Sequence, residues 1–155
     1  MVLRRCKTNE ALSNWFEGGQ DMEKWHKTSC VLWLCNSLSE ESGIEIDTDI
    51  DLSEERLTQE TKMVLFRVTQ EALANIRKHS QASRAELRLK ENRDRITLTI
   101  EDNGIGFVPS SRWKLRCEGK AGLVGIQERV GLIDGSFELR SKAGQGTTVR
   151  VEIPL

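Results

Sequence analysis

The chain has 155 residues, and its 23 basic and 24 acidic side chains leave a formal net charge of −1. This balance excludes the strong positive field that draws proteins to nucleic acid or to anionic membranes. The longest apolar run, Val31 to Cys35, has five residues, far fewer than the roughly 20 that span a bilayer. With no signal-peptide pattern, we expect one cytoplasmic domain without direct nucleic-acid contacts or a membrane segment, which leaves room for a longer parent protein anchored in the inner membrane.

The first 42 residues are expected to form a linker and a helix. Residues 1–20 are mixed in composition and carry two adjacent glycines near their end, so we assign them to a linker or a frayed segment. Residues 21–42 carry apolar side chains at helical spacing, and Gly43 is a suitable residue to end the helix. Because the apolar side chains face several directions, this helix packs either on the domain or on a missing partner helix.

The remaining residues, 43–155, alternate between strand-like and helix-like patterns. Period-2 alternation predicts five strands, over residues 44–50, 84–90, 94–102, 136–141 and 147–153. Helical patterns cover residues 57–80 and 122–134. Because every strand alternates, one sheet face is buried and the other is wet, as an antiparallel or mixed sheet allows. We predict an α+β fold, a two-layer α/β sandwich whose mixed, mostly antiparallel sheet is covered on one face by helices.

One predicted strand ends in an acid where its pattern requires an apolar residue. Apolar residues alternate with polar ones from Ile96 to Ile100, so Asp102 is expected to continue the buried face. A carboxylate in that position is costly unless donors satisfy it. Gly104 and Gly106 follow, and they let backbone pass close to a neighbour. An acidic acceptor in an apolar cleft, covered by bare backbone, suits the exocyclic amine of adenine.

The longer predicted helix carries a polar stripe. Glu71, Asn75 and His79 are four residues apart and share one face. A carboxylate, an amide and an imidazole on a cleft wall suit a proton, a metal ion and a phosphate chain. Mg²⁺ prefers oxygen ligands, and the amide oxygen of Asn75 is one. The alternative is structural, with Glu71 paired to Arg67 or Lys78 and His79 stabilised by the negative end of the helix dipole.

Nine of the twelve glycines lie between Gly104 and Gly146. The Gly-Leu-Val-Gly run at residues 122–125 opens the second predicted helix, where free N–H groups favour a phosphate, although such a run also marks close packing alone. Residues 107–121 form a connection longer than most, and hence a candidate lid. Its basic side chains either approach phosphate oxygens or are simply solvated; they are Arg112, Lys114, Arg116 and Lys120.

Four segments in order resemble the nucleotide-binding motifs of the sensor histidine kinase catalytic domain, within the gyrase, chaperone, histidine-kinase and mismatch-repair ATPase superfamily. Residues 66–79 resemble the N box, and residues 102–107 resemble the first glycine box. Residues 122–129 resemble the second glycine box in the form typical of NarX/DesK-type kinases, and residues 144–147 match the last motif before the closing strand. The resemblance covers about residues 40–155 and implies a Bergerat-type ATP-binding fold.

The resemblance implies that ATP and Mg²⁺ are the cofactors. Asp102 would accept a hydrogen bond from the adenine amino group, with Thr147 assisting through water. Asn75 would complete the Mg²⁺ shell. The reaction implied is transfer of the γ-phosphoryl group to a histidine, in which positioning and charge stabilisation supply most of the catalysis.

The same resemblance implies roles for the other motif residues. Lys78 or His79 would contact phosphates, and Glu71 would help to activate the accepting histidine. The glycine boxes would hinge the lid and bring the backbone to the nucleotide, through Gly104, Gly106, Gly122, Leu123 and Gly125.

The accepting histidine is expected to be absent from this chain. Kinases of this type carry it on the first of two dimerising helices with an acidic residue after it, whereas His26 is followed by Lys27. We interpret residues 21–42 as the end of the second dimerisation helix and residues 43–155 as the ATP-binding catalytic domain. The expected partners are a dimerisation domain with the phosphoacceptor and a response regulator with a helix-turn-helix output domain. Two alternatives stay open, an anti-sigma-type serine kinase and a non-catalytic ATP-binding regulatory module.

Overall fold

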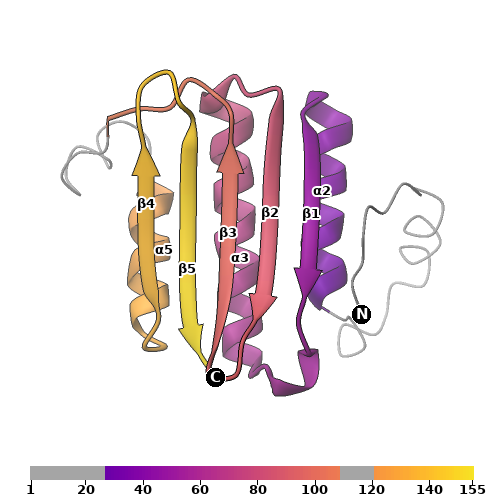
Figure 1. The fold of residues 1–155 in the computed structure, drawn as a ribbon, viewed down its shortest axis with the longest axis vertical. Coiled ribbons are helices and arrows are strands. Elements are labelled where there is room, and N and C mark those ends of the chain that lie inside the picture. Colours follow the sequence, from indigo (N-terminus) through magenta and orange to yellow (C-terminus); the bar gives the residue numbers. More distant parts are fainter. Residues whose placement is uncertain (1–26, 109–120) are drawn as a thin grey trace.

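The computed structural model describes residues 27–108 and 121–155 as an open five-stranded sheet with three α-helices on one side (Figure 1). The strands are β1 (Glu45–Asp51), β2 (Arg84–Glu91), β3 (Arg95–Asp102), β4 (Ser136–Ser141) and β5 (Thr147–Pro154). The helices are α2 (Lys27–Ser42), α3 (Gln59–Asn75) and α5 (Ala121–Gly131), with the 3₁₀ turn η2 (Glu54–Arg56) and the π-helical turn η3 (Ile76–Ser80). The predicted two-layer α+β sandwich is confirmed.

The strand order is β1-β2-β3-β5-β4, with β1 parallel to β2 and the other neighbours antiparallel. A parallel pair needs a long crossover, which η2, α3 and η3 supply. This topology brings the end of β3 beside the starts of β2 and β5, because Asp102 pairs with Ala85 on one side and Thr147 on the other. The sheet is therefore mixed and mostly antiparallel, as predicted.

The core lies between the sheet and the helices. Ile96, Leu98 and Ile100 of β3 are at most 2% exposed, and the alternating residues Thr97 and Thr99 are partly exposed on the other face. Period-2 alternation therefore assigned the correct buried face to β3. Asp102 continues that face, as expected.

Helix α2 belongs to the helical layer of the domain. Its Val31, Cys35 and Leu38 are buried in the same core as the α3 residues, and burial raises the pKa of the Cys35 thiol to about 12, so this side chain packs as a neutral group. Gly43 ends the helix at φ +72°, and its N–H donates to Ser39 O at 2.9 Å. Packing against the domain, one of the two modes predicted for this helix, is therefore observed.

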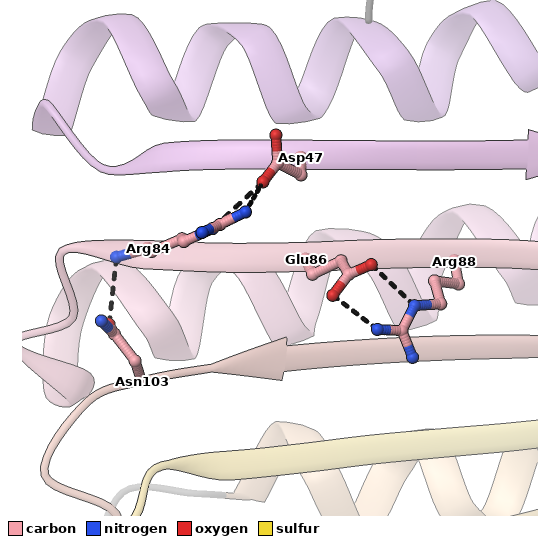
Figure 2. Close-up of polar contacts among 5 residues, drawn as sticks. All are labelled: Asp47, Arg84, Glu86, Arg88 and Asn103. Atoms are coloured by element: carbon pink, nitrogen blue, oxygen red, sulfur yellow. Dashed lines mark hydrogen bonds and ion pairs between the residues drawn. The ribbon is translucent and has the colours of Figure 1, made fainter. Parts of the chain in front are cut away.

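The opposite face of the sheet carries charged side chains that pair along and across the strands (Figure 2). Arg84 of β2 donates from Nε to Asp47 Oδ2 of β1 at 3.0 Å, and Arg88 donates to both carboxylate oxygens of Glu86 at 2.7 and 2.6 Å. Exposed pairs of this kind contribute about 0–1 kcal/mol each. They keep this face and the β1 edge hydrated rather than hold the fold together.

Several element boundaries differ from the prediction. Helix α3 begins at Gln59 because the Thr58 hydroxyl accepts from Thr61 N at 3.1 Å and caps the first turn. The second predicted helix ends at Gly131 rather than at residue 134. None of the helices within residues 27–108 and 121–155 is long and apolar enough to cross a membrane. The linker expected over residues 1–20 and the start of the helix expected from residue 21 lie outside the described residues.

Candidate functional site

A cleft of about 480 Å³ lies between the C-terminal end of α3 with its π turn, the end of β3 and the start of β5. Leu123 of α5 also contributes to its wall. The polar lining residues described are Asn75, His79, Ser80, Asp102 and Thr147, and the apolar ones include Ile76, Ile100, Ile105, Phe107 and Val149. Mostly apolar walls with a few convergent polar groups are typical of small-molecule sites.

Asp102 is the acid of this cleft. Its half-buried carboxylate loses hydration, which raises its pKa above the ordinary value, while hydrogen bonds from the backbone N–H groups of Gly104 and Thr147 act in the opposite direction. The Gly104 N–H donates to Asp102 Oδ1 at 2.8 Å. The carboxylate is thus oriented by backbone donors and retains acceptor capacity for a ligand, because two oxygens offer about four lone-pair sites.

Asn75 is the last residue of α3 and lines the same cleft. Its Nδ2 is buried and has no hydrogen-bond partner, the one such side-chain atom within the described ranges. A buried unpaired donor is costly. The amide is therefore set to contact a ligand that supplies an acceptor.

The helical segment does not stay regular up to Ser80 as predicted, because Ile76–Ser80 form a π turn. The turn brings Ser80 against the loop after β3, where Ile105 N–H donates to Ser80 O at 2.7 Å. A Cβ on Gly104 would overlap that carbonyl and also approach Asp102 Oδ1 at 2.8 Å. Gly104 is therefore required for the close packing that shapes the acid's surroundings.

The loop after β3 is also held by the β4–β5 connection. Gly144 N–H donates to Ile105 O at 2.6 Å, and Phe107 N–H donates to Ser141 Oγ at 2.9 Å. Gly106 has φ +58°, and a Cβ there would overlap the carbonyl oxygen of Lys142. Both features favour glycine at residue 106.

The glycines of α5 have two different environments. A Cβ on Gly122 would overlap the carboxylate of Glu71, so helices α3 and α5 are in close contact at this point. A Cβ on Gly125 would meet no atom within 4 Å. Packing within the protein thus explains the glycine at residue 122 and not the one at residue 125.

The structure gathers six of the predicted site residues around the cleft, namely Asn75, His79, Asp102, Gly106, Leu123 and Thr147. Gly104 lies directly behind the acid, and Glu71 and Gly122 contact each other. Lys78 is exposed and is not among the lining residues described. Arg67, which the structural alternative paired with Glu71, donates to Gln70 Oε1 at 3.0 Å.

Sequence reasoning overlooked three residues whose hydrogen bonds hold the loop after β3, namely Ser80, Asn103 and Ser141. The side chain of Asn103 points toward Arg84 at the start of β2 (Figure 2). Its Oδ1 accepts from Ser83 N and Arg84 N, each at 3.0 Å. The asparagine of the first glycine box is the one signal that was available, because asparagine often satisfies local backbone groups.

Several predicted features lie outside the described residues. They are most of the candidate lid, with Arg112, Lys114, Arg116 and Lys120, and also His26.

The family model described as histidine kinase-, DNA gyrase B- and HSP90-like ATPase matches residues 60–155. The chain belongs to this family. Among curated relatives, it is 37% identical over 119 residues to the signal transduction histidine-protein kinase/phosphatase DegS of Brevibacillus brevis, covering 77% of this chain and 30% of that protein. It is 33% identical over 113 residues to the oxygen sensor histidine kinase NreB of Staphylococcus carnosus, covering 73% and 32%. The chain thus spans about a third of these relatives.

Solved structures share the fold. The histidine kinase domain of the blue-light activated kinase EL346 of Erythrobacter litoralis superposes with a TM-score of 0.69 at 20% identity, over 83% of this chain and 61% of that one. The histidine kinase AdeS of Acinetobacter baumannii gives a TM-score of 0.62 at 12% identity, over 83% and 62%. The resemblance stated from the four motifs is therefore confirmed at the level of family and fold.

Proposed function

We propose that this chain is the ATP-binding catalytic domain of a two-component sensor histidine kinase. The observation that carries the proposal is the half-buried Asp102 at the end of β3 in a largely apolar cleft, in a chain with sensor-kinase relatives. The carboxylate accepts from the adenine amino group, and Thr147 assists on the neighbouring strand. Ile100 and Val149 offer apolar surface to the purine ring.

Asn75 and His79 are the residues we assign to the Mg²⁺-bound triphosphate. The Asn75 amide fits this ligand, because its oxygen is of the type that Mg²⁺ prefers and its unpaired Nδ2 is a donor for a phosphate oxygen. Within residues 27–108 and 121–155, no group of three acidic, histidine or cysteine side chains is arranged to hold a metal ion. The ion would therefore take its other ligands from phosphates and water, and when bound it supplies charge neutralisation on the phosphoryl group.

The reaction is transfer of the γ-phosphoryl group to a histidine on a separate dimerisation domain. A nitrogen–phosphorus bond forms at the imidazole, the bond from the γ-phosphorus to the bridging oxygen breaks, and ADP leaves. Glu71, beside Gly122, is the residue that we assign to activation of the histidine. A response regulator with a helix-turn-helix output domain then receives the phosphoryl group, and we place the reaction in the cytoplasm.

Titration with a fluorescent ATP analogue and Mg²⁺ tests the nucleotide site. We expect saturable binding that weakens at least about tenfold in Asp102→Asn, because hydrogen bonds to charged groups contribute about 1.5–3 kcal/mol. Asp51→Asn is the matched control, since Asp51 is an exposed acid at the end of β1. Absence of saturable binding, or equal affinities for the two variants, would contradict the assignment.

Incubation with γ-labelled ATP and a separately supplied dimerisation domain of a related kinase tests the transfer. Acid-labile label on the histidine of that domain is expected. Acid-stable label on a serine would favour the serine-kinase alternative. Tight ATP binding without transfer to any histidine domain would favour a non-catalytic module.

A further inference from the structure

Ser141, the last residue of β4, is not among the residues that line the cleft, yet its hydroxyl contacts two residues that do. Phe107 N–H donates to Ser141 Oγ at 2.9 Å, and Ser141 Oγ lies 2.8 Å from Thr147 Oγ1. Ser141 Oγ also lies 3.1 Å from the carbonyl oxygen of Gly146, a second possible acceptor for its proton. One half-buried hydroxyl thus joins the loop after β3 to the start of β5.

The Ser141 hydroxyl has a single proton to donate, and this limits the hydrogen bonds that its neighbours can form with it. A serine hydroxyl has one proton and two lone pairs, and the Phe107 N–H occupies one lone pair. If the proton goes to Gly146 O, Thr147 must donate to Ser141 and presents lone pairs to the cleft. If the proton goes to Thr147, the Thr147 proton is free to point into the cleft. In both arrangements, Ser141 restricts the orientation of the Thr147 hydroxyl.

The same hydroxyl holds one end of the segment Ile105–Phe107 against the β4–β5 connection. A second contact is the 2.6 Å hydrogen bond from Gly144 N–H to Ile105 O. Ile105 and Phe107 both line the cleft. Loss of the Ser141 hydroxyl would therefore leave the Phe107 N–H without this acceptor and loosen one wall of the cleft.

We propose that Ser141 is a positioning residue for nucleotide binding, which acts on the ligand through the Thr147 hydroxyl and the Phe107 backbone. This inference rests on the proposed function, because it takes the cleft as the site of the adenine nucleotide. Ser141 is not a catalytic residue, since it acts through other groups. Its hydroxyl is the part that matters, so a threonine should replace it and an alanine should not.

The test compares affinities for the fluorescent ATP analogue with Mg²⁺ at a temperature where all variants are folded. Ser141→Ala should weaken binding about five- to tenfold, the effect of about one lost hydrogen bond. Ser141→Thr should stay within about twofold of the wild type. Ser136→Ala is the matched control, because Ser136 is the exposed serine at the other end of the same strand. Amide exchange at Phe107 should be faster in Ser141→Ala and unchanged in Ser136→Ala.

A double-mutant cycle with Thr147→Val tests the route of the effect. If Ser141 acts through Thr147, the loss of affinity from Ser141→Ala should be clearly smaller in the Thr147→Val background. Effects that multiply independently would overturn the proposal. So would an unchanged affinity in Ser141→Ala, even with lowered stability.

If Ser141→Ala does not fold, Ser141→Cys, which keeps the size but hydrogen-bonds weakly, should weaken binding in the same direction. Absence of binding by the wild type would instead refute the proposed function.

Discussion

Asp102 is subject to two opposing influences on its ionisation. Desolvation in the cleft raises the pKa of its carboxyl, and hydrogen bonds from the backbone N–H groups of Gly104 and Thr147 partly counteract that rise. The net effect is upward, so burial in the cleft makes the charged form of the carboxyl costly. A ligand that donates to the carboxylate relieves part of that cost. At the scale of single residues, Asp102 suits a nucleotide amine, and its ionised form should also lower the stability of the ligand-free protein.

This cost predicts a pH dependence of stability. Between the ordinary value of about 3.8 and the raised native pKa, the native state holds more protons at Asp102 than the unfolded state. The free energy of unfolding then falls as pH rises. We expect the wild-type value minus that of Asp102→Asn to decrease as pH rises through this window and to level off above the native pKa. Urea unfolding at a series of pH values measures the difference.

Glu152 should affect the pH dependence of stability in the opposite direction to Asp102. Hydrogen bonds from Arg150 and Arg95 lower the pKa of its carboxyl. Its contribution to the free energy of unfolding is fully present at pH values above the ordinary glutamate pKa and is lost as pH falls through the lowered native pKa. The free energy of unfolding of the wild type minus that of Glu152→Gln should therefore increase with pH. A difference for Asp102→Asn that also increased with pH would contradict the raised pKa.

At the scale of elements, the β4–β5 connection controls the geometry beside the acid. It carries two glycines with nearly the same backbone conformation, Gly144 at φ +79° and Gly146 at φ +80°. A Cβ on Gly144 would meet nothing within 4 Å, whereas a Cβ on Gly146 would overlap the carbonyl oxygen of Asp102. An alanine at residue 144 would therefore cost conformational strain alone, whereas an alanine at residue 146 would cost the same strain and a steric overlap.

We expect Gly144→Ala to lower the free energy of unfolding by about 1–2 kcal/mol, the cost of the left-handed conformation for a residue with a Cβ. Gly146→Ala should lose about 1–3 kcal/mol more, because a backbone oxygen cannot move aside as a flexible side chain can. Urea unfolding of both variants measures the losses. Equal losses would mean that the backbone at Asp102 yields to the new Cβ.

At the scale of the whole molecule, helix α2 closes the core over the β1 side of the sheet (Figure 1). Val31, Cys35 and Leu38 are 3%, 1% and 7% exposed. Arg77 Nη1, in the π turn, also lies 3.2 Å from Glu41 Oε2 near the end of α2. The contacts of α2 are those of a component of the sandwich.

This packing predicts the outcome of truncation. A chain beginning at Gly43 should lose at least about 4 kcal/mol relative to one beginning at Lys27, because burial of each large apolar side chain contributes about 1.5–3 kcal/mol. That loss is comparable to the whole stability of a marginal domain. Thermal and urea unfolding of the two chains measures it. Equal stability would support the interpretation of α2 as the remnant of a dimerisation helix.

Local patterns in the sequence were sufficient for the strands, for the buried face of β3 and for Asp102 at its end, because strand periodicity is a property of neighbouring residues. They were also sufficient for the glycines beside the acid, since glycine at such positions reports close backbone approach. The order of the four motifs was enough to identify the family.

Contacts between distant residues decided the rest. The parallel pairing of β1 with β2 and the packing of α2 on the core both depend on segments far apart in the chain. The Phe107–Ser141 hydrogen bond joins residues 34 positions apart. No local period or spacing encodes such contacts, because they arise only when folding brings distant segments of the chain together.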